Sequence, residues 1–176
     1  MAVSSTTRPR RLTLVRHGHA QDKGPGHRDF DRALDRRGRA EVAEMARRCL
    51  DLELMPDLLV TSAAARALQT AEAFERLLVW PSPPLRVEPR LYLAEAATLL
   101  EFIRGTDDGV SHLMLVAHNP GLGDLAQQLA PEARFTGFET AATCSMTSPA
   151  AATFLSAGMS APGASRLATN ERVIAG

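Results

Sequence analysis

Five polar residues follow three short apolar runs that each have the composition of a buried strand. Arg16 and His17 follow the run LTLV, Ser62 and Arg66 follow DLLVT, and His118 follows LMLVA. In open α/β sheets, ligands bind at the carboxyl ends of the strands. We therefore expect these side chains to meet in one crevice and to form a compact cationic pocket.

Such a pocket is suited to a dianionic phosphoryl group. Guanidinium forks such as those of Arg16 and Arg66 pair with phosphoryl oxygens through bidentate hydrogen bonds. The helix start after Asn119 adds backbone N–H donors. An imidazole has an unperturbed pKa near 6.5 and is a nucleophile when neutral, so His17 is able to attack phosphorus.

Other kinds of site have less support. A single histidine at a strand end is commonly a structural group, and only the combination with two arginines and a second histidine favours catalysis. His17 and His19 could share a zinc ion, but neither HExxH nor CxxC is present, so we expect no metal and no cofactor. The absence of a GxSxG motif argues against a serine hydrolase.

Alternating strands and helices must position these residues. Helical spacing of apolar residues follows Asp35, a candidate N-cap, and Ser62 is a candidate cap for the next helix. Further strands are expected near 85–88, 152–155 and 172–175, with helices around 99–103 and 122–129, and loops at 80–84 and 156–165. The alternation predicts an α/β three-layer sandwich with a mostly parallel central sheet flanked by helices.

Length and composition limit the kind of protein. The 176 residues favour one domain over 1–176, with a flexible N-terminus over 1–11. Twenty basic residues balance twenty acidic ones, which gives no overall field for nucleic acid or an anionic membrane. We find no signal peptide or membrane span and expect a cytoplasmic protein. The two cysteines suggest no disulfide framework, and Cys49 is expected in the core.

Four motifs in order resemble the histidine phosphatase (phosphoglycerate mutase-like) superfamily, and specifically its small SixA-like phosphohistidine phosphatase branch. The resemblance covers about Leu12 to Leu129. It comprises the RHG signature at residues 16–18, a D-R-x-L-x-x-x-G segment at 31–38, S-x-x-x-R-A-x-Q-T-A at 62–71, and H-N-P-G at 118–121. The fold that it implies is the same phosphoglycerate mutase-like α/β sandwich.

The resemblance also implies residue roles. His17 becomes the nucleophile that is transiently phosphorylated, while Arg16, Arg66 and His118 bind the phosphoryl oxygens. From the chemistry, His118 would contribute best as a cation that donates a charge-assisted hydrogen bond. Gly18, Asn119 and Arg32 are further candidates for substrate binding, with Arg32 at the rim of the pocket.

The general acid of larger family members has no clear counterpart. Glu95 is a possible acid and Glu88 a weaker one, although both also suit structural positions. An imidazole leaving group is far less basic than an alkoxide, so a pocket without a committed acid favours phosphohistidine in a protein, or a small phosphoester. The short, proline-rich segment between Leu78 and Glu95 predicts an open pocket that can admit a side chain of another protein.

Three alternatives remain from the sequence. A phosphoglycerate mutase-like enzyme or sugar-phosphate phosphatase would require a placed acid. A non-catalytic phosphoryl-binding module would keep the basic pocket, and a zinc hydrolase would lose activity with a chelator.

Overall fold

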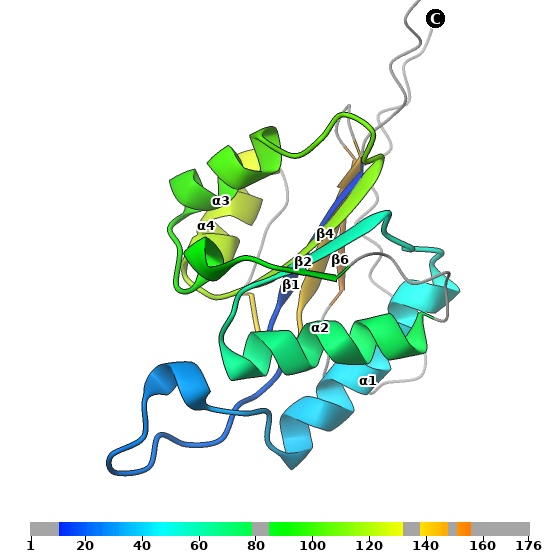
Figure 1. The fold of residues 1–176 in the computed structure, drawn as a ribbon. Coiled ribbons are helices and arrows are strands. Elements are labelled where there is room, and N and C mark those ends of the chain that lie inside the picture. The colour runs from blue at the N-terminus through cyan, green and yellow to red at the C-terminus, as the bar shows by residue number, and fades with distance from the viewer. Residues whose placement is uncertain (1–10, 79–84, 132–137, 148–150, 156–176) are drawn as a thin grey trace, which may run out of the picture.

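A six-stranded sheet lies between two pairs of helices in the computed structural model of this chain (Figure 1). The structure describes residues 11–78, 85–131, 138–147 and 151–155, the last range as backbone only. The strands run in the order β3-β2-β4-β1-β5-β6. Their bounds are β1 Arg11–Arg16, β2 Leu58–Thr61, β3 Leu85–Val87, β4 His112–Ala117, β5 Thr143–Thr147 and β6 Ala151–Leu155.

The sheet is parallel over its first four strands. Strand β4 pairs in parallel with both β1 and β2, and β2 pairs in parallel with β3. Strands β5 and β6 extend the sheet beyond β1 in antiparallel fashion. This arrangement confirms the predicted fold class, a three-layer α/β sandwich with a mostly parallel sheet.

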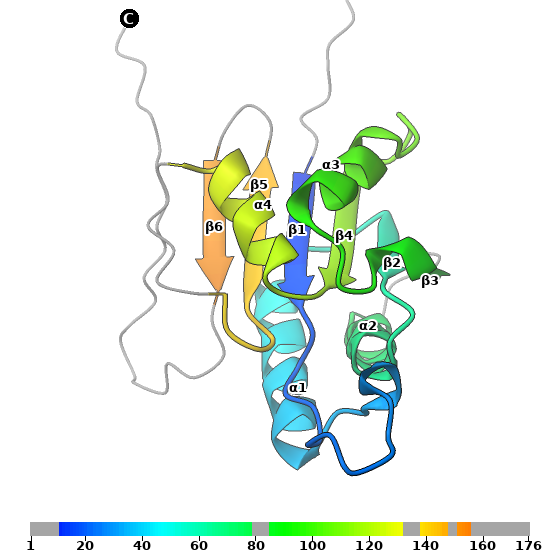
Figure 2. The same ribbon diagram turned by 90° about the vertical axis from the view of Figure 1, so that its left-hand side faces the viewer.

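Two helices cover each face of the sheet, as the views in Figures 1 and 2 agree. Helices α1 and α2 pack on one face, and α3 and α4 pack on the other. Two 3-10 turns, η1 and η2, lie in the connections. The bounds are α1 Arg36–Asp51, α2 Ala65–Leu77, α3 Ala96–Arg104, α4 Gly121–Leu129, η1 Asp29–Asp31 and η2 Pro89–Leu91.

Strand residues alternate between the two cores. In β1, Leu14 packs with the α3 and α4 side, whereas Val15 packs with the α1 and α2 side. Met114 and Leu115 divide in the same way in β4. Because both faces are covered, successive side chains are all buried, and the strands appear in the sequence as continuous apolar runs.

Of the two N-caps predicted from the sequence, the one for α1 is confirmed and the one for α2 is not. Asp35 is the N-cap of α1, and its side chain accepts a 2.7 Å hydrogen bond from the Gly38 amide. The expectation that Ser62 caps the next helix is wrong. Helix α2 begins two residues later than expected, with Ala64 at its N-cap, and the Ser62 hydroxyl is bonded to His118 instead.

The remaining expectations for the elements have mixed outcomes. Cys49 is fully buried in the core, as predicted. Arg11 already belongs to β1 and not to an N-terminal extension, and β5 was not predicted. The strand expected at 172–175 and the loops expected at 80–84 and 156–165 lie outside the described residues. None of the helices described is long and apolar enough to cross a lipid bilayer.

Candidate active site

The parallel strands bring the two histidines together at their carboxyl ends. His17 follows β1 and His118 follows the neighbouring β4, and the His17 amide donates to the Ala117 carbonyl at 3.2 Å. The two imidazole rings lie with their centroids 5.0 Å apart. Ser62, directly after β2, joins the same edge through its amide, which donates to Val116 at 3.0 Å.

The His17 ring is held in a defined tautomer. Its Nδ1 lies 2.8 Å from the Gly18 carbonyl oxygen, which can only accept, so the ring proton is on Nδ1. Its Nε2 accepts a 3.2 Å hydrogen bond from Arg66 Nε and therefore carries the lone pair. Burial, together with the nearby charges of Arg66 and Arg16, lowers the pKa of His17 to about 4. The ring is neutral at pH 7, as a nucleophile must be.

The His118 ring has one bonded and one unbonded nitrogen. Its Nε2 lies 2.8 Å from the Ser62 hydroxyl. That hydroxyl also accepts from the Ala64 amide at 3.4 Å. We assign its proton to the bond with Nε2 and the ring proton to Nδ1. In the described part of the chain, the buried Nδ1 has no hydrogen-bond partner. In the assigned tautomer, an N–H donor is available at the site.

The protonation state of His118 differs from the expectation. We expected a cation, but burial, followed by the nearby His17 and Arg66, lowers the pKa of His118 to about 3. The ring is therefore neutral while the pocket contains no anion. A bound dianion would act in the opposite direction, because a negative charge favours the protonated ring.

The two arginines differ in what occupies their guanidinium groups. Arg66, from the start of α2, is 3% exposed and uses three nitrogens, donating through Nε to His17, through Nη1 to the Asp29 carbonyl at 2.6 Å and through Nη2 to the Asp29 carboxylate at 2.9 Å. Arg16 donates through Nη1 to the Phe138 carbonyl at 2.7 Å. Within the described residues, the buried Arg16 Nε has no partner, so it is a second donor available to an anion.

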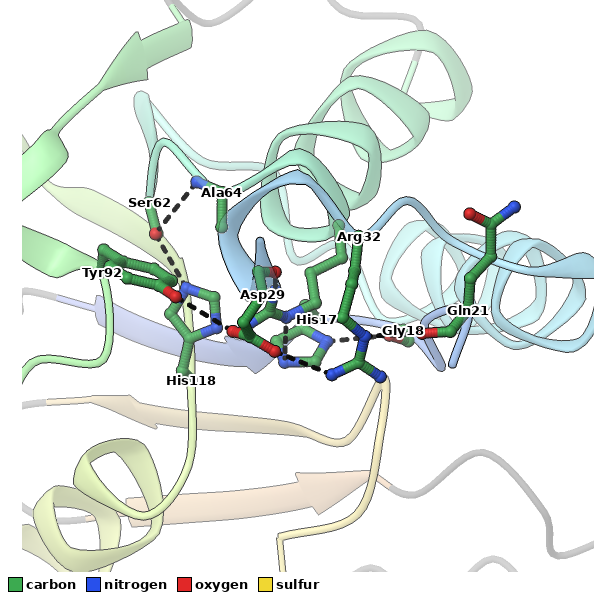
Figure 3. A network of polar contacts seen from close by, with 10 residues as sticks. His17, Gly18, Gln21, Asp29, Arg32, Ser62, Ala64, Tyr92 and His118 are labelled. Atoms are coloured by element: carbon green, nitrogen blue, oxygen red, sulfur yellow. Dashed lines mark hydrogen bonds and ion pairs between the residues drawn. The ribbon is translucent and has the colours of Figure 1, made fainter. Parts of the chain in front are cut away.

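Asp29 and Tyr92 belong to the site although the sequence did not indicate them. The Asp29 carboxylate accepts from Arg32 at 2.8 Å, from Arg66 at 2.9 Å and from the Tyr92 hydroxyl at 3.0 Å. Figure 3 shows it between Tyr92 and Arg32. The Tyr92 ring stands edge-on to His118, with centroids 5.5 Å apart. Hydrogen bonds, first that from Arg32, hold the pKa of Asp29 well below its usual range.

These two residues could not be recognised by spacing. Asp29 lies in η1, inside a long irregular connection between β1 and α1, and no hydrophobic period places it relative to the strands. It stands two residues before Asp31, where the D-R-x-L segment begins. Tyr92 follows η2 and reaches the site only because the chain turns there. The one usable signal was that Tyr92 is the only tyrosine.

The other candidates have structural partners. The Gly18 amide donates to Thr70 Oγ1 at 3.1 Å, so its own N–H is already occupied. A Cβ at Gly18 would lie 2.6 Å from the Val42 side chain, which explains why only glycine fits. Arg32 lies beside Asp29 and also donates to the Gln21 carbonyl at 2.6 Å. Asn119 donates to the Phe138 carbonyl at 2.6 Å.

The glutamates lie differently from Asp29. Glu88 is buried, caps η2 and pairs with Arg86 and Arg90 at 3.3 and 3.2 Å. Glu95 is exposed and occupies the N-cap position of α3 without a side-chain cap bond. Asp29, by contrast, bonds directly to Arg66, a predicted catalytic side chain. No three His, Cys, Asp or Glu residues in these parts of the chain are grouped to hold a metal ion.

Comparison with known proteins assigns the class of protein that this fold and site indicate. Residues 12–95 match the family model described as histidine phosphatase superfamily (branch 1). A crystal structure of the putative phosphohistidine phosphatase SixA from Agrobacterium tumefaciens is 33% identical, with a TM-score of 0.73, and the match covers 78% of this chain and 91% of that one. The chain belongs to the histidine phosphatase superfamily.

Two further relatives agree. The structure of the protein histidine phosphatase SixA complexed with tungstate is 25% identical, with a TM-score of 0.68, over 82% of this chain and 94% of that one. An uncharacterized protein of Picosynechococcus is 33% identical over 68% of this chain and 72% of its own length. Within the superfamily this protein is SixA-like, and it is a phosphatase.

Proposed function

We propose that this phosphatase removes phosphoryl groups from phosphohistidine in a protein through a phosphohistidine intermediate on His17. The observation that carries the proposal is the arrangement around His17 Nε2. That atom holds a lone pair, lies 3.2 Å from Arg66 Nε, and belongs to a ring 5.0 Å from that of His118. The arrangement offers a nucleophile and cationic donors to one tetrahedral anion.

Each residue has a distinct part in the proposed transfer. Arg66 Nε moves its hydrogen bond from His17 Nε2 to a phosphoryl oxygen, and the freed lone pair of Nε2 attacks phosphorus. The Gly18 carbonyl stabilises the N–H of the resulting phosphoimidazolium. Arg66, Arg16 Nε and His118 Nδ1 donate to the phosphoryl oxygens, which carry the charge in the transition state. Water then cleaves the N–P bond. No step requires a metal, so we expect activity to persist in a chelator.

A phosphohistidine substrate is supported by the SixA relatives, a putative phosphohistidine phosphatase and a protein histidine phosphatase, and by the placement of the carboxylates. Neither Glu88 nor Glu95 makes a described side-chain contact with His17 or His118. The carboxylate that does lie at the site, Asp29, has a strongly lowered pKa and is a poor proton donor. A leaving group of low basicity suits such a pocket better than an alkoxide.

A labelling experiment tests the nucleophile. The protein is incubated with a labelled phosphoryl donor, quenched, and divided between base and acid. An N-linked phosphate should survive base and be lost in acid. The His17→Ala variant should retain no label and should lose about 10⁴-fold or more in turnover, the scale seen when a nucleophile is removed. Label retained on His17→Ala would refute the role of His17.

A further inference from the structure

Asp29 and Tyr92 are the more exposed members of the group of side chains around the two histidines. His118 and Arg66 are almost inaccessible, at 1% and 3% exposed, whereas the Asp29 side chain is 33% exposed. A group attached to a phosphoryl seated against the two histidines must extend toward solvent. Asp29 is bonded to Arg66, which in turn bonds His17, so such a leaving group can come within reach of this carboxylate.

The Asp29 carboxylate retains capacity to accept. Its Oδ1 accepts from Arg32, and its Oδ2 accepts from Arg66 Nη2 and the Tyr92 hydroxyl. An ionised carboxylate offers about four lone-pair positions, so three donors leave one position open. A phosphoryl oxygen that takes over Arg66 Nη2 would free another. Asp29 is also firmly ionised, because hydrogen bonds hold its pKa well below the usual range.

We propose that Asp29 accepts a hydrogen bond from the free ring N–H of the substrate's phosphoimidazole and thereby selects phosphohistidine over phosphoesters. The inference rests on the proposed function. Tyr92 serves as a positioning residue, because its hydroxyl holds Asp29 Oδ2 and its ring packs against His118 and Phe30.

The chemistry of the leaving group explains the selection. A phosphoimidazole protonated on its second nitrogen carries a positive ring. When His17 Nε2 forms its bond to phosphorus, the P–N bond of the substrate breaks and its electron pair returns to the ring nitrogen. The second nitrogen keeps its proton, so a neutral imidazole leaves without further proton transfer. The Asp29 charge stabilises the cationic ring and raises its pKa.

Phosphoesters gain nothing from the same carboxylate. The bridging oxygen of an alkyl or aryl phosphate has no proton to donate to Asp29. As the P–O bond breaks, negative charge develops on that oxygen beside an ionised carboxylate, which is an unfavourable interaction. Asp29 should therefore accelerate one class of substrate and oppose the other.

Asp29→Asn tests the inference, with phosphoimidazole and p-nitrophenyl phosphate as substrates. The ratio of kcat/KM for phosphoimidazole to kcat/KM for the aryl phosphate should fall by about 10- to 100-fold, the scale of a lost hydrogen bond to a charged group. The pH profile of kcat reports groups in the enzyme–substrate complex. Its alkaline limb for phosphoimidazole should move to lower pH in this variant. Asp29→Glu should restore part of the ratio. Asp31→Asn, at an exposed position of the same turn, is the matched control.

The outcomes separate this inference from the proposed function. An equal fall on both substrates would mean that Asp29 acts only by positioning Arg66, and would overturn the inference. Unchanged kcat/KM values for both substrates would overturn it as well. If the unaltered protein hydrolyses the aryl phosphate but neither phosphoimidazole nor a phosphohistidine protein, the proposed function itself fails. A shifted pH profile together with a reduced ratio supports the inference.

Discussion

A histidine lies at each end of β4, and the two imidazole rings differ in their hydrogen bonds. His112, at the first residue of the strand, has both nitrogens bonded, Nδ1 to the Met55 carbonyl at 2.7 Å and Nε2 to the Thr13 hydroxyl at 2.8 Å. His118, just after the last residue, has a buried Nδ1 without a partner among the described residues. Both are nearly inaccessible, at 6% and 1%.

The difference teaches how a structural histidine is distinguished from a candidate catalytic one. Burial lowers the pKa of both rings, so the direction of the shift does not separate them. A buried polar atom without a protein partner can bond a ligand or a water. His118 also has a second imidazole and Arg66 nearby, whereas the bonds of His112 are complete. This contrast supports our proposal that the active site lies at the carboxyl end of the sheet.

Arg66→Ala should give the largest loss of kcat among the substitutions that compare the two ends of β4. Arg66→Ala removes the guanidinium that faces the His17 lone pair, and we expect a loss of about 10³- to 10⁵-fold in kcat, the scale for an arginine that stabilises phosphoryl transfer. Because Arg66 is buried and bonded to His17 and Asp29, the midpoint of thermal unfolding should also fall, so kcat is compared on protein shown to be folded. Arg76→Ala, at an exposed position of the same helix, is the control for kcat.

Substitution of His118 should have a smaller effect on catalysis than loss of Arg66. His118→Gln removes the Nδ1–H donor, and we expect a fall of about 10²- to 10³-fold in kcat, as for other preorganised transition-state donors. Steady-state hydrolysis of a phosphohistidine protein measures it. Activity within threefold of the unaltered protein would show that His118 is as structural as His112.

Substitution of His112 should lower stability and leave catalysis nearly unchanged. His112→Leu leaves the Thr13 hydroxyl and the Met55 carbonyl without this partner, so the free energy of unfolding should fall by about 1 to 3 kcal/mol. The kcat should stay within about twofold, because the side chain lies at the far end of the strand from the site. Chemical denaturation and the phosphatase assay measure the two quantities. A large loss of kcat in a folded variant would contradict the comparison.

The pH dependence of stability tests whether the two histidines at the carboxyl end are buried as neutral rings. The pKa of His17 is lowered to about 4 and that of His118 to about 3, so between these values and about 6.5 the unfolded chain binds more protons. The free energy of unfolding should therefore decrease as pH falls from about 6.5 toward 4. His118→Gln should make this decrease shallower. An unchanged slope would indicate that His118 is not buried as a neutral ring.

Much of the fold could be predicted because burial on both faces leaves a clear record in the chain. The runs containing Leu14, Val60 and Leu115 correspond to central strands, and Asp35 begins α1 as its residue type suggests. Strand β5 was missed because threonine, serine and cysteine dominate it and its pairing with β1 comes from a distant segment. The Ser62 cap was mistaken because residue type alone does not fix where a helix begins, and α2 has its N-cap at Ala64.

The sequence alone determined the order of the strands and helices other than β5, the family motifs and the presence of two histidines at strand ends. Those features follow from local chemistry and from the parallel sheet, in which carboxyl ends meet. The tertiary structure decided which polar atoms have hydrogen-bond partners. It set the free Nδ1 of His118, the tautomer of His17 and the position of Asp29 beside Arg66, because hydrogen bonds between distant segments depend on three-dimensional distance, which residue spacing does not encode.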